Sequence, residues 1–295
     1  MLKRLYNGSI YRIKGIWGSI NRLFYKEPYI IDTINGLNSI KMESSSVSRF
    51  GDGEFNIIMG KSLGFQKYDS LLAQRLLDVL QSDNSNLKVA IPDVFGSLKE
   101  YRDKPAAFWR AYLGVNRGKI ISMLDLKRTY YNTNMTRFWS GYKTSEKTED
   151  IIRAYKKIWA NKNVIFIEGK LTRMGVGNDL FDNVKSIRRI LCPAKDAWFK
   201  YSEILETIKN NRCDDALYII ALGPTATVLA YDLCNMGLQA LDLGHIDVQY
   251  EYYKRKAKEK IALEGKYVNE NENGNIVSDS IIDENYINSI LSCIE

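Results

Sequence analysis

The feature that most constrains the fold of this chain is an alternation between short, apolar, β-rich runs and longer stretches with helical periodicity. This alternation is typical of a sheet with helices on both faces. The expected strands are Ser46–Phe50, Leu87–Pro92, Lys119–Leu124, Val164–Glu168, Ile187–Cys192, Leu217–Leu222 and Ala240–Leu243. The expected helices are Ser70–Gln81, Lys104–Leu113, Thr148–Asn161, Phe199–Asn210, Thr225–Met236 and Ile246–Lys260, followed by a surface loop at Asn269–Asn275 and a short carboxy-terminal helix. Because no long linker rich in Pro, Gly or Ser divides the 295 residues, we expect one large α/β domain rather than two.

The cysteines and the apolar runs indicate the compartment. The four cysteines lie far apart and lack C-x-x-C spacing, and a chain of this length does not need a disulfide framework. They are Cys192, Cys213, Cys234 and Cys293. No apolar run reaches the length of about 18 residues that a membrane span needs, and the amino terminus lacks the apolar core of a signal peptide. We therefore expect reduced thiols in a cytoplasmic protein.

The amino-terminal arm, residues 1–43, is basic and amphipathic. Six basic residues precede the first acidic residue, Glu27, and seven apolar residues recur at spacings of three or four. The basic residues are Lys3, Arg4, Arg12, Lys14, Arg22 and Lys26, and the apolar ones are Leu2, Tyr6, Ile10, Ile13, Trp17, Ile20 and Phe24. Two interpretations fit: a helix whose apolar stripe packs on the protein's own core, or a peripheral contact of residues 1–26 with an anionic membrane. Three glycines in this segment weaken an isolated helix, so we favour packing on the core.

Residues that follow strands are the first place to look for a ligand, because ligands bind beyond the carboxyl ends of parallel strands. The first such junction reads SRFGDGEF over residues 48–55. Gly51 allows backbone angles that other residues avoid and lets a ligand approach the main chain. Asp52 and Glu54 stand two apart, so one turn can direct both carboxylates at Mg²⁺ or Mn²⁺, while Arg49 pairs with phosphate or with one of the acids. The alternative is a polar turn with a local ion pair, which a DxE pair alone favours.

The second junction follows the apolar run VIFIE and forms a polar loop with three glycines, EGKLTRMGVGND. Backbone N–H groups at the glycines can turn toward an anion, and the basic side chains add positive charge. The candidate ligand-binding residues of this loop are Glu168, Arg173, Gly175, Gly177, Asn178 and Asp179. The loop matches neither G-x-G-x-x-G nor the P-loop pattern, so neither of those mechanisms applies. An ordinary polar loop is the alternative.

The third junction, ALGPTAT, places Gly223 at a strand end and Pro224 in the first turn of a helix. The free amides of that turn, with the hydroxyls of Thr225 and Thr227, can bind an anion. Ordinary strand-to-helix connections have the same features, so this junction alone decides nothing.

The fourth junction, DLGHID, contains the single histidine of the chain, His245. A single histidine excludes a zinc site built from several histidines, and the chain lacks the G-x-S-x-G turn of serine hydrolases of this fold class. With Asp242 and Asp247 nearby, His245 can act as an oriented base or donate a hydrogen bond to phosphate, and the alternative is a residue that only caps a helix. Because all four junctions follow strands, we expect them to share one edge of the sheet and to form a metal–diphosphate site.

The formal net charge of +7 indicates an anionic partner. Nucleic acid, a membrane surface and a phosphorylated small molecule all fit this charge. We do not expect nucleic acid, because no nucleic-acid-binding motif is recognised and the excess charge is concentrated in the arm.

Six blocks of the sequence resemble, in the same order, the GT-D type glycosyltransferases, a family first described as a domain of unknown function in bacterial protein-glycosylation and surface-polysaccharide loci. The blocks are RFGDGEF at 49–55, EGKLTRMGVGNDLFDN at 168–183, ILCPAKDAWFKY at 190–201, LGPTATVLAYDL at 222–233, DLGHIDVQYEYY at 242–253 and GKYVNE at 265–270. Together they cover most of residues 44–270, and the arm lies outside the resemblance.

The resemblance implies a single Rossmann-like domain over residues 44–295, with a mostly parallel sheet that binds a UDP-sugar. The implied reaction is transfer of a hexose, of glucose type, to a glycan acceptor on protein or lipid in bacterial glycoprotein or surface-polysaccharide synthesis. The implied reaction would take place in the cytoplasm or at the inner face of the membrane. A nucleotide-binding or membrane-recruited scaffold module without catalysis is the alternative.

Carried onto this chain, the resemblance makes Asp52 and Glu54 the ligands of Mn²⁺ or Mg²⁺ at the diphosphate, and it makes the glycine-bearing junctions the nucleotide cradle. If the reaction inverts the sugar, His245 or Asp247 is the expected base. The family's aromatic-rich segment after the third strand corresponds to RTYY at 128–131, with TRFW just beyond it.

Overall fold

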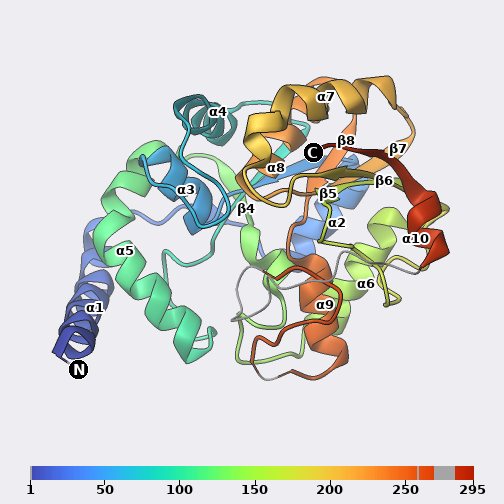
Figure 1. Ribbon diagram of the computed structural model, residues 1–295. Coiled ribbons are helices and arrows are strands. Elements are labelled where there is room, and N and C mark those ends of the chain that lie inside the picture. The colour runs from blue at the N-terminus through green and yellow to red at the C-terminus, as the bar shows by residue number, and fades with distance from the viewer. Residues whose placement is uncertain (1, 258, 269–282) are drawn as a thin grey trace.

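The computed structural model describes residues 2–257, 259–268 and 283–295. Within these ranges, nine strands form one sheet in the order β1-β4-β3-β2-β8-β7-β5-β6-β9, and all neighbours pair in parallel (Figure 1). The strands are β1 (Tyr29–Ile30), β2 (Ser46–Arg49), β3 (Leu87–Ile91), β4 (Thr129–Asn132), β5 (Asn163–Gly169), β6 (Ser186–Cys192), β7 (Ala216–Ala221), β8 (Gln239–Asp242) and β9 (Ile290–Cys293). The α-helices are α1 (Leu2–Asn21), α2 (Thr33–Glu43), α3 (Asp52–Ile58), α4 (Ser70–Gln81), α5 (Asp103–Met123), α6 (Thr148–Trp159), α7 (Tyr201–Asn210), α8 (Pro224–Asn235), α9 (Ile246–Lys254) and α10 (Glu284–Ser289). Short 3₁₀ turns are η1 (Arg22–Phe24), η2 (Thr133–Arg137) and η3 (Ala197–Lys200).

The sheet buries both of its faces, as the alternation along β5 shows. Val164 and Phe166 belong to a core cluster with Trp159 of α6, whereas Ile165 and Ile167 pack with residues of α7 and α8. Figure 1 shows the two layers, with α7 and α8 on one side of the strands and α6 and α9 on the other. Successive side chains of a strand face opposite sides, so a strand buried on both faces reads as a continuous apolar run. The predicted class, a Rossmann-like parallel sheet with helices on both faces, is confirmed.

Helix α4 shows why the periodic segments were predictable. Asp69 caps the helix, and its Oδ1 atom accepts from the backbone N–H of Leu72 at 2.9 Å. The apolar residues Leu72, Leu76 and Val79 fall on one helical face, and all are buried against the sheet's core. The helix has the bounds that the sequence predicts.

The expected strand at Lys119–Leu124 is wrong, because nearly all of this segment belongs to the end of α5. Gly114 resembles a helix breaker, but here it allows α1 to approach: a Cβ at Gly114 would lie 2.1 Å from the carbonyl oxygen of Lys14. The buried side chain of Arg117 donates to the Phe95 carbonyl oxygen at 2.8 Å and so fixes this part of α5 to the rest of the domain. The strand of this region is β4, which the sequence reading treated as an aromatic segment.

The expected packing of the α1 stripe on the core is also wrong. The helix contacts α5 through its glycines, and the side chains of Ile13, Trp17, Ile20 and Phe24 are exposed. In the part of the chain that the structure describes, no helix is both long enough and apolar enough to cross a membrane.

The rest of the arm takes part in the sheet. Strand β1 pairs with β4, and α2 packs against α6. The division into an arm of residues 1–43 and a domain from residue 44 stays a prediction. At the other end, the expected short helix is α10, and β9 after it adds an edge strand beside β6 that the sequence reading missed. The expected loop Asn269–Asn275 lies outside the described residues.

Candidate active site

The four candidate junctions follow β2, β5, β7 and β8, which are neighbours in the order β2-β8-β7-β5. Because these strands are parallel, their carboxyl ends lie together, and the expectation that the junctions share one edge is confirmed. The next strand after β2 is β3 on one side of it, and the next strand after β8 is β9 on the other side, so the direction of the chain across the sheet reverses between β2 and β8. Such a reversal is where open α/β sheets bind their ligands.

Arg49 and Asp242 join the two strands at this reversal. The Nη2 atom of Arg49 lies 2.9 Å from Oδ1 of Asp242, and its Nε atom donates to the Asp242 carbonyl oxygen at 2.6 Å. Its Nη1 atom donates to Oγ1 of Thr136 at 2.7 Å. A side chain at Gly244 would disturb this pair, because a Cβ there would lie 2.9 Å from Nη2. The acid that pairs with Arg49 therefore comes from the fourth junction rather than from the DxE pair.

The DxE acids lie at the start of helix α3 rather than in a simple turn. The backbone N–H of Gly51 donates to Oε2 of Glu54 at 2.7 Å, which is the glutamate half of a capping box. Burial, reinforced by the nearby charge of Asp242, raises the pKa of Glu54 to about 7. Asp52 lies in the first turn, and Tyr112 of α5 donates to its carbonyl oxygen at 3.3 Å. One oxygen of Glu54 is thus engaged within its own helix.

The donor set decides what kind of metal site would fit here. Over the described ranges, no three His, Cys, Asp or Glu side chains are gathered in a way that could hold a metal ion. Two carboxylates suit Mg²⁺ or Mn²⁺ when other oxygens complete the shell, as the phosphate oxygens of a ligand do. Asp52 and Glu54 therefore fit an ion that arrives with a diphosphate, and they do not fit an ion held by protein alone.

The third junction is tied to the same edge of the sheet. Gly223 has a φ of 56° just before α8 begins at Pro224. A Cβ at Gly223 would lie 2.8 Å from the ring of Phe65. The Oγ1 atom of Thr227 donates to the carbonyl oxygen of Arg49 at 2.9 Å. Thr225 and Thr227 are both completely buried, so their hydroxyls face other parts of the protein and not a ligand. A nucleotide contact at this turn would fall to its backbone amides.

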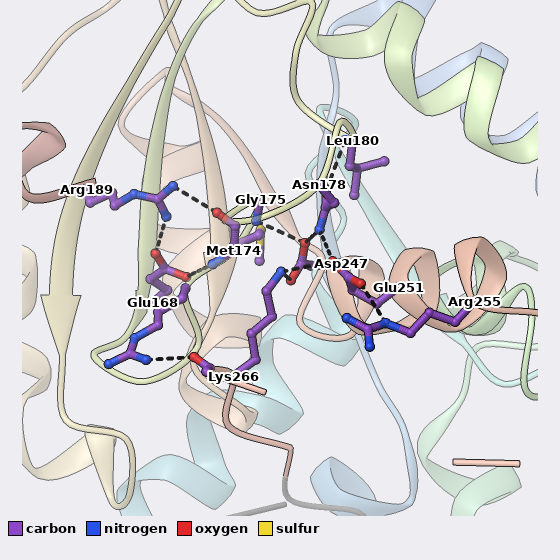
Figure 2. Close-up of polar contacts among 12 residues, drawn as sticks. Glu168, Met174, Gly175, Asn178, Leu180, Arg189, Asp247, Glu251, Arg255 and Lys266 are labelled. Atoms are coloured by element: carbon purple, nitrogen blue, oxygen red, sulfur yellow. Dashed lines mark hydrogen bonds and ion pairs between the residues drawn. The ribbon is translucent and has the colours of Figure 1, made fainter. Parts of the chain in front are cut away.

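Glu168 is completely buried and holds the second junction to the sheet. Its Oε1 atom pairs with Nη1 of Arg189 at 2.5 Å, and its Oε2 atom accepts from the backbone N–H of Met174 at 2.7 Å (Figure 2). Arg189 also donates to the Met174 carbonyl oxygen at 2.9 Å. Burial raises the pKa of Glu168, and the charge of Arg189 opposes that shift. These contacts position the loop, and the contact of Glu168 with a nucleotide sugar stays a prediction.

Asp247 fastens the other side of the same loop. Its Oδ1 atom accepts from the backbone N–H of Gly175 at 3.0 Å and from Nδ2 of Asn178 at 2.8 Å. Its Oδ2 atom pairs with Nζ of Lys266 at 2.6 Å (Figure 2). Only 2% of Asp247 is exposed, so an acceptor hydroxyl has no approach to this carboxylate. In this structure Asp247 positions the loop, and its role as a catalytic base stays a prediction.

The remaining residues of this loop are also used to position it. Arg173 is buried and donates to the carbonyl oxygen of Gly265 at 2.8 Å. Asp179, at the exposed end of the loop, accepts from the hydroxyl of Tyr250 at 2.9 Å. Gly177 has a φ of 77°, an angle that favours glycine. Because the side chains fasten the loop to its surroundings, its backbone is the part left for the predicted nucleotide contact.

His245 is the remaining candidate base at this edge. It is half-buried just before α9, and Nη2 of Arg137 lies 3.3 Å from its Nε2 atom. Because a guanidinium only donates, this contact places a lone pair on Nε2. Arg137 belongs to η2, the same turn that supplies Thr136 to Arg49.

The sequence predictions assign no role to four residues that build this edge, and they expect Asp242 beside His245 rather than paired with Arg49. Thr136 and Arg137 follow the aromatic segment, and Lys266 is the second residue of the last block of the resemblance. Arg189 is the fourth, and its one signal was its place next to the apolar run of residues 190–192, because a charge in a buried strand requires a partner.

A parallel sheet with an arginine–acid pair at its strand reversal defines a Rossmann-like α/β protein with a ligand site at that edge. Residues 47–271 match the model of the glycosyltransferase GT-D fold family. The chain belongs to this family, and the resemblance seen in the six sequence blocks is confirmed.

Two curated relatives come from streptococci. "Probable glycosyl transferase Gly" of Streptococcus gordonii is 34% identical over 244 residues, which are 82% of this chain and 35% of the relative. "Glycosyltransferase GlyD" of Streptococcus pneumoniae serotype 4 is 33% identical over 278 residues, which are 92% of this chain and 34% of the relative. This chain therefore spans about a third of the length of the curated relatives that it matches.

Solved structures of the family match nearly the whole chain. One is the structure reported as "The highly conserved domain of unknown function 1792 has a distinct glycosyltransferase fold", with a TM-score of 0.86 at 32% identity over 98% of this chain and 99% of that chain. Another is "A New Glycosyltransferase (DUF1792) from Streptococcus sanguinis", with a TM-score of 0.86 at 31% identity over 91% of this chain and 100% of that chain.

Proposed function

We propose that this chain is a metal-dependent glycosyltransferase that moves a hexose of glucose type from a UDP-sugar to a glycan acceptor. The observation that carries the proposal is the Arg49–Asp242 pair at the strand reversal, with Asp52 and Glu54 shortly after the arginine and His245 shortly after the aspartate. A cation, an arginine and backbone amides at one edge of the sheet suit a diphosphate leaving group. Membership of a glycosyltransferase fold family supports the same chemistry.

In this proposal Asp52 and Glu54 hold Mn²⁺ or Mg²⁺ through their carboxylate oxygens. The bound ion supplies charge stabilisation at the diphosphate as UDP departs. Arg49, fixed by Asp242 and Thr136, adds a positive charge at the same place. The backbone around Gly223 and in the loop after β5 forms the nucleotide cradle. Stabilisation of the departing UDP is the main catalytic effect, because negative charge on it is largest in the transition state.

His245 is the proposed base. In an inverting reaction, the ring must first leave the Arg137 guanidinium, and the freed lone pair of its Nε2 atom then takes the proton from the acceptor hydroxyl. The nearby Arg137 guanidinium orients the ring, and η2 links this contact to Arg49. In a retaining reaction, His245 would instead contact phosphate.

The proposed setting is bacterial glycoprotein or surface-polysaccharide synthesis in the cytoplasm. The acceptor would be a glycan carried by a protein or a lipid. The streptococcal relatives, both named as glycosyltransferases, support a bacterial sugar-transfer role.

A donor screen with release of nucleotide as the readout tests this function. UDP-glucose, UDP-galactose and their N-acetyl forms would be offered with Mn²⁺ and then with EDTA. We expect UDP release with one donor, abolished by EDTA and lowered on the order of 10²–10³-fold in Asp52→Ala and Glu54→Ala. The matched control is Asp78→Ala, which removes an exposed acid of α4 and should leave turnover unchanged. Normal turnover in both active-site variants would overturn the proposal.

The same material tests the alternative. A nucleotide-binding scaffold would bind UDP in calorimetry and consume none of the donors with any acceptor. That result would replace the enzymatic function with a binding function at the same site.

A further inference from the structure

Helix α1 and the turn after it present an apolar stripe to solvent. Six side chains, called here the α1 patch, are each between 44% and 77% exposed. They are Ile13, Ile16, Trp17, Ile20, Leu23 and Phe24. Their helical spacing places them on one side of α1. Soluble proteins rarely expose apolar residues in a continuous group of this kind unless another surface covers them.

The contact between α1 and α5 fixes the direction in which the α1 patch faces. A Cβ at Gly18 would lie 1.9 Å from the carbonyl oxygen of Arg110, so the two backbones touch at this point. Next to it, Oδ1 of the buried Asn21 accepts from Nε of Arg117 at 2.9 Å. Gly18 lies on the side of the helix opposite the middle of the stripe, and Asn21 lies at the edge of the stripe, next to Trp17 and Phe24. Rotating α1 to bury its stripe would break these contacts, so the α1 patch is held outward.

Basic side chains accompany the α1 patch. Arg12, Lys14, Arg22 and Lys26 are all exposed, and the first acidic residue of the chain, Glu27, comes after them. Figure 1 shows α1 at the outer margin of the molecule, with its amino terminus directed away from the sheet. A second copy of the chain on the α1 patch would bring like charges together, which opposes association. A surface with an apolar interior and anionic groups at its boundary with water complements both the apolar stripe and the basic side chains.

We propose that the α1 patch docks on an anionic lipid bilayer. The six apolar side chains enter the boundary between headgroups and acyl chains, and the basic side chains lie among the headgroup phosphates. A cavity of about 500 Å³ beside Trp17 and Phe24, walled by Val115 and Lys119 of α5, continues the mixed apolar and basic character of this surface. The inference rests on exposure and charge, and it stands whether or not the proposed transfer reaction is correct.

Co-sedimentation of the full chain with vesicles tests the docking surface. The vesicles are phosphatidylcholine alone and phosphatidylcholine mixed with phosphatidylglycerol. The apolar variant carries Ile16→Ser, Trp17→Ser and Phe24→Ser. The basic variant replaces Arg12, Lys14, Arg22 and Lys26 by Gln. We expect the wild type to bind the mixed vesicles and each variant to bind them at least about tenfold more weakly.

A matched control carries Leu71→Ser and Phe199→Ser, which remove apolar side chains that are 61% and 59% exposed on other elements. It should bind like the wild type. Thermal unfolding of every variant separates loss of binding from loss of fold. Failure of the wild type to bind mixed vesicles, or binding as strong as that of the wild type in both the apolar and the basic variant, would overturn the proposal. Self-association in sedimentation velocity that the apolar variant abolishes would also overturn it and assign the surface to a second copy.

Discussion

The ammonium group of Lys266 lies 2.6 Å from Oδ2 of Asp247, and both side chains are buried. Glu251 is the second acid near this ammonium, with Oε1 at 3.7 Å from Nζ. Because the other oxygen of Asp247 binds Gly175, the pair connects the segment after α9 to the loop after β5. An acid that the sequence suggests as a base therefore has a positioning role.

Asp247→Asn should lower the free energy of unfolding, because it leaves the buried ammonium of Lys266 with Glu251 as its remaining acid. We expect a loss near the lower end of about 3–5 kcal/mol, measured by urea unfolding. The double variant Asp247→Asn with Lys266→Met removes both charges and should recover part of the loss. A single variant as stable as the wild type would show that the pair contributes nothing to the loop.

Glu54 should make stability depend on pH when EDTA removes metal ions. Its pKa in the folded protein, about 7, is above its ordinary value of 4.5, so the folded state holds this proton more tightly than the unfolded state does. Its contribution is therefore complete below pH 4.5 and is lost as the pH rises through about 7. Urea unfolding on both sides of this window should show the loss in the wild type and not in Glu54→Gln. Identical pH profiles for the two proteins would contradict the assignment.

Arg49→Lys should lower turnover while the fold is retained. Lysine keeps the charge but lacks the planar fork that reaches Asp242 and Thr136 together, so the charge at the diphosphate would be misplaced. We expect turnover to fall by about 10²-fold. Arg75→Lys is the matched control, because Arg75 pairs with Asp232 at 2.5 Å on other helices of the fold. Equal losses in the two variants would indicate a general effect of the substitution on stability.

Gly18→Ala should separate α1 from α5. The added methyl group would lie 1.9 Å from the carbonyl oxygen of Arg110, and backbone atoms cannot move away as a flexible side chain can. We expect a loss of about 1–3 kcal/mol in the free energy of unfolding. Gly64→Ala is the control, because nothing lies within 4 Å of a Cβ at that position. A Gly18→Ala protein as stable as this control would contradict the close helix contact.

The sequence predicted the parts of the fold in which local pattern and burial agree. Strands such as β5 and β7 are apolar because both faces of the sheet are covered, and α4 has a cap and one buried face. The pattern failed for α5, where Gly114 serves a neighbouring helix and is not a break. It failed for β4, whose four residues include polar ones and are ordered by the strands beside them.

For the candidate site, the sequence located the loops but not the partners of their side chains. The DxE pair was found, yet only the structure shows that Glu54 bonds to Gly51 and that Arg49 pairs with Asp242. These pairings join positions that are far apart in the chain, and spacing along a single sequence carries no information about them. The ion pair of Asp247 was not predicted for the same reason, because its partner Lys266 comes from another segment.

Helix α5 contacts both the candidate active site and helix α1. Its Tyr112 donates to the carbonyl oxygen of Asp52, and its Gly114 lies against α1. A bilayer under α1 would therefore hold the candidate active site at a constant height above the lipid headgroups. Under the proposed function, only a lipid-linked glycan whose growing end stands at that height would meet the donor. The distance set by α1 and α5 would thus select acceptors by their length.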